Sequence, residues 1–439
     1  MYLFAEGCPG GFAYAGAREE AEISASGKAG PGVDIDDAYI GRRVREIRAW
    51  RDVSITATAG LAGISQSYLS MIELGQRPVT KRAVLEALAH ALQVSPAEFF
   101  DKPWERGTTT LEVQAHAGLI AVAAALDAYE LGVDIGEPMR EWPEVAADVQ
   151  RAADLTHVHA DYLAQVELIP RLLGDLHALY VHRPQLRREV LVSLILCYKS
   201  ALTMTKRLGG GSGYSLMAAV LAQRCAEELD SPRWRAITTW YRGYAAGSMN
   251  RALQYQRAVR MAEELDPELD DPEVVQAYGM LHLSAAMAAA AQTDRDTATT
   301  HLNEAAKVAN RLDPEVGTFA WTWFGRTNVG IWRVAVGLEL GDGPKVAEIA
   351  RNVEVRAMPS PARQASFYAE VGRSLLPRKR TRDKGVALLL RAESLSPQHI
   401  RNDVFVREAV ADQLRTARRD AGGRELRGLA YRMGITPIG

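Results

Sequence analysis

A short segment after a glycine turn carries the side chains best suited to recognising another molecule. Ile64, Leu69 and Ile72 follow helical spacing and are expected to form a buried stripe. The residues that point away from this stripe, several from the N-terminal half of the helix, are Gln66, Ser67, Tyr68, Ser70 and Met71. A helix that presents amides and hydroxyls from its first turns can hydrogen-bond to base edges in a DNA major groove. The segment therefore predicts a DNA-recognition helix.

Small residues before this segment indicate how the helix is positioned. Ala59 and Gly63 are the residue types required where two helices cross at a tight turn. A larger side chain at 59 would collide, and glycine tolerates a positive φ at 63. Ser65 can accept a hydrogen bond from a free amide as an N-cap. The spacing predicts helices at about 55–62 and 66–74 that form a helix-turn-helix.

Basic residues are concentrated around this motif. Residues 40–82 contain eight Lys or Arg against three Asp or Glu, a net +5, whereas residues 1–39 contain two against seven, a net −5. The whole chain carries −2, so the remainder also carries −2. A compact basic segment in a neutral or acidic chain is typical of a phosphate-binding module. An arginine-rich, solvated helix face is the alternative interpretation.

Composition and periodicity divide the chain into five segments and predict an all-α fold. Residues 1–38, rich in Gly, Ala and Glu, are expected to be a disordered extension or a wrongly assigned start. Residues 39–102 predict a five-helix domain, with helices at about 39–52, 55–62, 66–74, 80–92 and 96–100. Residues 103–110 predict a linker, residues 111–420 a helical repeat domain for sensing or oligomerisation, and residues 421–439 a C-terminal tail.

The string A-x-x-L-x-P recurs in the helical domain. It occupies residues 262–267, 309–314 and 392–397, and residues 226–232 carry it with one insertion. The leucines at 229, 265 and 312 are 36 and 47 residues apart, and the next follows after 83, close to two such periods. Repeats of helical hairpins have this spacing. Each string is expected to close a helix, since Ala packs closely, Leu seals the hairpin and Pro stops continuation.

Residues 40–100 resemble the lambda-repressor/Cro-like helix-turn-helix family, also called the XRE family. The resemblance rests on strings spread over the whole segment: Ile40-Gly41-Arg42-Arg43-Val44-Arg45-x-Ile47-Arg48, Ala62-Gly63-Ile64-Ser65-Gln66-Ser67-Tyr68-Leu69-Ser70, Ile72-Glu73-x-Gly75, Arg77-Pro78, Leu85-x-x-Leu88-Ala89-x-x-Leu92, and Val94-x-Pro96-x-Glu98-Phe99-Phe100. It implies a transcription regulator that binds double-stranded DNA. It does not identify the operator.

The resemblance also implies roles for individual residues. It places Gln66, Ser67, Tyr68 and Met71 at base-facing and phosphate-facing positions, with Ser70 beside them. Arg48 and Glu73 match a structural ion pair between the first and third helices. The candidates for phosphate contacts are Arg43, Arg45, Gln76, Arg77, Lys81 and Arg82. The second helix departs from the family pattern at Thr58, where Leu is usual, at Gly60 in mid-helix, and at Thr56, where Gln is common.

The repeated strings resemble the tetratricopeptide family. The Trp-x-x-Leu-Gly-x-x-Tyr opening of that repeat is missing and the period varies, so another helical stack is the alternative. A superhelical stack has a concave face where aromatic and amide side chains can grip a ligand. Asn250 and Asn328, each beside aromatic residues, could clamp a peptide backbone there. Core packing is the competing interpretation for the aromatic clusters.

Other chemistries find little support in the sequence. The three thiols, Cys8, Cys197 and Cys225, lack metal-binding or disulfide spacing, and His157 and His159 would lie on different helix faces. No cofactor motif is present, because the glycine-rich residues 209–213 lack the ending of a phosphate loop. No apolar run reaches about 18 residues, so no membrane segment is expected. We expect no metal site and no enzyme activity.

These observations favour a cytoplasmic, nucleoid-associated bacterial regulator that binds DNA as a homodimer. Its helical repeat domain is expected to bind a peptide or small-molecule signal, to mediate dimerisation, or both. Two alternatives remain. A DNA-tethered interaction scaffold would bind a protein but no small ligand, and a hidden enzyme would need a converging set of polar residues. The sign of regulation and the effector are not evident from the sequence.

Overall fold

A computed structural model of the chain describes residues 33–34, 40–99, 110–134, 136, 139–208, 211–247, 251–265, 270–313, 315–417 and 423–436. The extension expected over residues 1–38 lies outside the described residues except for Val33 and Asp34. The expected linker also lies outside them except for Thr110. The all-α prediction is confirmed. The described residues add only two two-residue strands, β1 (Val33–Asp34) and β2 (Ile435–Thr436), which pair in parallel.

Residues 40–99, called the head below, fold as the periodicity predicts. The elements are α1 (Ile40–Trp50), α2 (Ile55–Leu61), α3 (Gln66–Glu73), α4 (Arg82–Ala91) and the 3₁₀ helix η1 (Pro96–Phe99). Their apolar stripes meet in one core that includes Val44, Leu69, Ile72 and Leu88. A Cβ on Gly41 would lie 1.8 Å from the carbonyl oxygen of Ile72, so glycine allows α1 to cross α3 closely.

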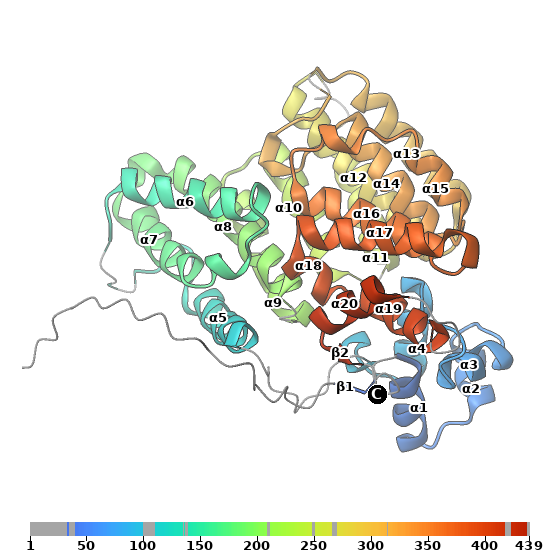
Figure 1. Ribbon diagram of the computed structural model, residues 1–439. Helices are drawn as coiled ribbons and strands as arrows, with labels where there is room; N and C mark the ends of the chain where they lie inside the picture. Colours follow the sequence, from blue (N-terminus) through green and yellow to red (C-terminus); the bar gives the residue numbers. More distant parts are fainter. Residues whose placement is uncertain are drawn as a thin grey trace, which may run out of the picture. The chain divides into compact units, whose positions relative to one another are not determined.

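Residues 110–436, called the helical region below, form a succession of antiparallel hairpins (Figure 1). Its α-helices are α5 (Thr110–Ala128), α6 (Trp142–His157), α7 (Leu168–His182), α8 (Arg187–Arg207), α9 (Gly211–Glu228), α10 (Pro232–Ala246), α11 (Arg251–Leu265), α12 (Pro272–Ala291), α13 (Arg295–Ala309), α14 (Arg326–Glu339), α15 (Lys345–Ala350), α16 (Pro361–Leu375), α17 (Arg382–Leu395), α18 (Pro397–Asn402), α19 (Val404–Ala417) and α20 (Arg424–Arg432). Short 3₁₀ helices are η2 (Leu163–Gln165), η3 (Pro184–Leu186), η5 (Phe319–Trp321), η6 (Val355–Ala357) and η7 (Lys379–Thr381).

Alternate helices of this region pack on one another. Neighbours along the chain pair as hairpins, such as α8 with α9 and α12 with α13, while α6, α8, α10, α12, α14 and α16 also contact in succession. Helix α18 then contacts both α16 and α8, so helices from the two halves of the stack meet. This pattern is a stack of helical repeats, with the even-numbered helices forming its inner layer.

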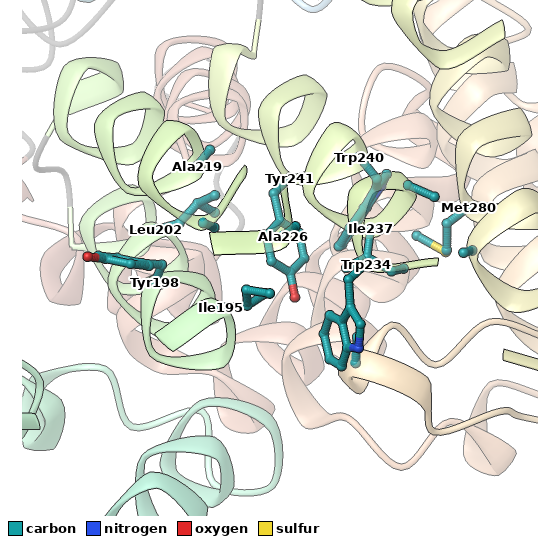
Figure 2. Close-up of a cluster of buried hydrophobic side chains, with 14 of the residues drawn as sticks. Ile195, Tyr198, Leu202, Ala219, Ala226, Trp234, Ile237, Trp240, Tyr241 and Met280 are labelled. Carbon is teal, nitrogen blue, oxygen red and sulfur yellow. The ribbon is translucent and has the colours of Figure 1, made fainter. Parts of the chain in front are cut away.

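The repeated strings end the outer helices as expected. They fall at the C-terminal ends of α9, α11, α13 and α17, and α10 and α18 begin at the prolines of two of them. The alanines that open the strings, at 226, 262, 309 and 392, are all buried. Large side chains fill the space between the layers: Figure 2 shows Tyr198, Trp234 and Tyr241 among aliphatic side chains from α8, α9, α10 and α12.

Two sequence expectations differ from the structure. Residues 424–432 form α20 instead of a tail, because Leu426, Leu429 and Ala430 bury one face in a core shared with α17 and α19. Helix α12 is long and apolar enough to cross a membrane by length and composition, contrary to the expectation that no such run exists. However, 83% of its apolar window is buried inside the structure, as in the core helix of a stack.

Candidate functional site

The turn between α2 and α3 has the geometry that its small residues predict. Gly63 has a φ of +64°, in the region that favours glycine, and Ala59 is buried at the helix crossing. The Ser65 hydroxyl caps α3 by accepting a hydrogen bond from the Tyr68 amide at 3.2 Å. Leu69 and Ile72 are fully buried beneath. The first turn of α3 is thus held rigidly with its other face turned outward.

The outward face of α3 carries the predicted recognition residues. Gln66 and Ser67 are exposed, and Tyr68, Ser70 and Met71 are half-buried. The hydroxyl of Thr56 on α2 donates to the Gln66 side-chain oxygen at 3.0 Å, which fixes the amide at the start of α3. Thr56 therefore contributes to the same surface, although sequence comparison singled it out only as a departure.

Arg48 and Glu73 lie together between α1 and α3. The arginine Nε donates to Oε1 at 2.6 Å and Nη2 donates to Oε2 at 2.9 Å, a bidentate pair in which the glutamate is buried. Nη1 of Arg48 also donates to the Val53 carbonyl oxygen. The hydrogen bond and charge of Glu73 raise the arginine pKa, despite opposing desolvation. The pair ties the recognition helix to α1.

The six candidates for phosphate contacts differ in their exposure and in the groups that their side chains contact. Arg45, Gln76 and Arg77 are exposed. Arg43 is half-buried, pairs with Glu46 and donates to the Glu98 carbonyl oxygen at 2.9 Å.

Lys81 and Arg82 are directed elsewhere. The Lys81 ammonium lies against Gly341 after α14, and the Arg82 guanidinium lies 5.7 Å from the centre of the Phe405 ring. Both side chains, which are half-buried, therefore contact the helical region, and their predicted phosphate contacts stay predictions. These contacts could not be predicted from local sequence, because the partners lie more than two hundred residues away.

The head contacts the helical region through several polar bonds. Arg251 at the start of α11 pairs with Glu86 of α4 at 2.9 Å, with both side chains largely buried. The Ala83 amide donates to Glu339 at 3.0 Å, and Arg373 donates to the Thr80 carbonyl oxygen at 3.0 Å. Movements of α11, α14 or α16 would therefore act directly on α4.

A cavity of about 400 Å³ lies within the helical region and reaches α4. Its wall is strongly basic, with acids only at Glu370 and Asp403 and bases at Arg82, Lys199, Lys206, Arg207, Arg251, Arg363 and Arg373. It is also aromatic, with Tyr162, Trp240, Tyr244, Trp321, Trp323, Trp332 and Phe405. The basic wall was not predicted from the sequence, because its residues come from helices that lie far apart along the chain and no local pattern marks them.

The predicted peptide clamp has a different environment from the one expected. Asn250 lies outside the described residues. Asn328 is buried in the cavity wall, where its amide nitrogen donates to the Thr322 carbonyl oxygen at 3.1 Å and its oxygen accepts from Arg363 at 3.0 Å. Both ends of the Asn328 amide are thus engaged within the chain, so its present role is to orient Arg363.

Among the residues that the structure describes, no group of three or more His, Cys, Asp or Glu side chains could hold a metal ion. His157 is buried and stacks on Trp321 with ring centroids 5.2 Å apart, whereas His159 is exposed. Burial holds the His157 pKa well below its usual value, so the imidazole is neutral.

Comparison with protein families identifies the head. Residues 40–99 match the model of a helix-turn-helix domain family. Searches among curated proteins and among solved structures found no match. The head is therefore a helix-turn-helix domain, which suggests a DNA-binding regulator.

Proposed function

We propose that this protein is a sequence-specific, DNA-binding transcription regulator of the XRE class and not an enzyme. The observation that supports this function is the face of α3, where Gln66 and Ser67 are exposed while Leu69 and Ile72 anchor the helix. A recognition helix reads bases from these N-terminal positions. Arg45, Gln76 and Arg77 are the side chains proposed to contact phosphates.

We also propose that the helical region is tetratricopeptide-like and binds a signal. The basic cavity supports this assignment, because its wall includes Arg82 of the head as well as residues from α8, α10, α14 and α16. A ligand in the cavity would therefore contact Arg82 of α4, which belongs to the helix-turn-helix domain. The protein is proposed to act as a cytoplasmic homodimer whose recognition helices span half-sites about 34 Å apart.

Genome-wide capture of bound DNA tests the proposal. The full chain is compared with Gln66→Ala, Ser67→Ala and Arg77→Ala, and with Gln150→Ala, a matched exposed glutamine on α6, as control. We expect discrete peaks that share an inverted repeat, retained by the control. Gln66→Ala should weaken binding to these sites by about 1–3 kcal/mol and relax their sequence preference.

Arg77→Ala should behave differently from Gln66→Ala. Loss of a phosphate contact weakens binding to all duplexes about equally. It also lowers the magnitude of the slope of log K against log salt concentration by about 1. Absence of binding by the unaltered chain, both to genomic fragments and to random duplexes at low salt, would overturn the DNA-binding function. Binding without an inverted repeat would overturn the proposed dimer.

A further inference from the structure

Lys199 is a buried amine that lacks a carboxylate partner among the described residues. Its side chain is only 5% exposed, and its ammonium lies 4.0 Å from the centre of the Trp240 ring and 4.7 Å from that of Tyr241. Burial, with help from Arg207 and Arg363, holds its pKa well below the usual value. Aromatic faces attract a cation, but they do not neutralise its charge. The native fold therefore bears a desolvation cost at this position.

Two arginines beside Lys199 are also paired with neutral groups. Arg207 contacts the imidazole of His399, whose pKa burial holds well below the usual range. Arg363 donates to Asn328 and lies over the Trp332 ring at 5.0 Å, and its Nη2 has no hydrogen-bond partner in the part of the chain that the structure describes. The cavity thus holds convergent donors, and the wall carboxyl groups whose charges act on the two arginines are Glu370 and Asp403.

The acids in the wall do not balance these cations. Burial raises the pKa of Glu370 to about 7, so a substantial fraction of this carboxyl group is neutral near pH 7. Asp403 then remains as the other acid in the wall, against six bases besides Arg251, which pairs with Glu86. An anion that enters the cavity would meet cations whose desolvation has already occurred, which strengthens the attraction.

A strained segment supplies flat surfaces to the same cavity. Ala320, Trp321 and Trp323 have φ values of +49°, +55° and +56°, in the left-handed region that non-glycine residues rarely adopt. The segment is held by the Gln276 side chain, which accepts from the Phe319 amide at 2.9 Å. The buried indole Nε1 of Trp323 has no partner among the described residues. Such strain is typical of functional sites, where the surrounding fold enforces it.

We infer that the cavity binds a small organic anion that contains a planar ring, with a phosphate or carboxylate group. The anionic group would be bound by Lys199, Arg207 and Arg363, and the ring would lie against the indoles of Trp321, Trp323 and Trp332. The cavity volume suits a small molecule. An extended peptide is disfavoured because α18 contacts α8 across the stack and the Asn328 amide is already engaged. This inference names the ligand class of the proposed signal-binding function and rests on it.

The test compares two fluorescent dyes with nearly the same rings, anilinonaphthalene sulfonate and uncharged phenylnaphthylamine. We expect the sulfonate to bind the full chain at least about tenfold more tightly than the neutral dye. Lys199→Met and Arg363→Met should each weaken sulfonate binding about tenfold or more, whereas Lys345→Met, at an exposed position on α15, should leave it unchanged. Equal affinities for the two dyes, or unweakened binding by both cavity variants, would overturn the inference.

Thermal unfolding without dye controls for folding. Lys199→Met should unfold at a higher temperature than the unaltered chain, because it replaces a buried amine that lacks an anion with an apolar side chain of similar length. Adenosine monophosphate and indole acetate then serve as competitors for the bound sulfonate dye. Displacement of the dye by adenosine monophosphate assigns a phosphate ligand, and displacement by indole acetate assigns a carboxylate ligand. Displacement by neither compound overturns both assignments. No DNA is present, so failure here leaves the head's proposed DNA binding intact.

Discussion

Glu408 on α19 should make the stability of the chain depend on pH. Its carboxylate is buried and accepts hydrogen bonds from the backbone amides of Ile40, at 3.1 Å, and Val79, both in the head. Burial is the largest influence and raises the Glu408 pKa from 4.5 to about 7, although Arg415 and the two amides oppose the change. The folded chain therefore binds a proton at Glu408 in a pH range where the unfolded chain has released it.

The sign and size of the effect follow from proton linkage. Between the unfolded pKa of 4.5 and the folded value of about 7, the native state holds more protons, so the free energy of unfolding falls as pH rises. The difference between these two pKa values corresponds to about 3 kcal/mol in the free energy of unfolding. Glu408→Gln keeps an oxygen that can accept from Ile40 but cannot ionise. The variant should therefore gain about 3 kcal/mol over the unaltered chain between pH 4.5 and pH 8.

Urea unfolding measured at intervals from pH 4.5 to pH 8 checks this prediction. Burial lowers the pKa values of His157, His177 and His282 in the folded chain, so their protonation in the unfolded chain also affects stability in this range. This effect is common to both proteins and cancels in the difference between variant and unaltered chain. Glu263→Gln, at an exposed position on α11, is the matched control and should give a difference that does not change with pH. A pH-independent difference for Glu408→Gln would refute the proposed cost of ionising this carboxyl group.

Three further substitutions test the packing of the head, each by thermal and urea unfolding. Gly60→Ala should raise stability by about 1 kcal/mol, because Gly60 is exposed in mid-helix with no atom within 4 Å of a new Cβ; a loss would contradict this. Thr58→Val should be neutral or stabilising by about 1 kcal/mol, since the buried Thr58 hydroxyl lacks a partner among the described residues; destabilisation would indicate a hidden bond. Gly41→Ala should cost about 1–3 kcal/mol and weaken DNA binding by separating α1 from α3, and an unchanged midpoint would reject that crossing.

The head was predictable because its signals are local. An N-cap at Ser65, a small residue at Ala59 and a glycine at Gly63 act within a few residues of one another, and the structure gives each the expected geometry. Helix α20 was missed because its apolar positions, Leu426 and Leu429, lie in a short and strongly basic segment. Its burial against α17 and α19 could not be seen in its own pattern.

The cavity was not predictable, since it is made by residues from distant helices. Lys199, Trp321 and Arg363 have ordinary local surroundings in the sequence, and only the stacking of alternate helices brings them to one wall. The net charge of the helical region was also a misleading guide to its cavity. The near-neutral total for the helical region conceals a basic interior, because acids such as Glu263 and Glu264 lie on its outer surface. Composition reports the sum of charges, whereas binding depends on which charges are desolvated together.

The proposed ligand would affect the head through side chains that both line the cavity and bond to the head. Arg251 lines the cavity and pairs with Glu86, so an anion in the cavity would compete with that carboxylate for the same guanidinium. Arg373 likewise lines the cavity while it donates to the Thr80 carbonyl oxygen. A ligand changes the head only to the extent that it binds more tightly to one arrangement of these contacts than to another. In the proposed homodimer, two recognition helices would meet half-sites one helical turn apart, so a small rotation of α4 would alter DNA affinity.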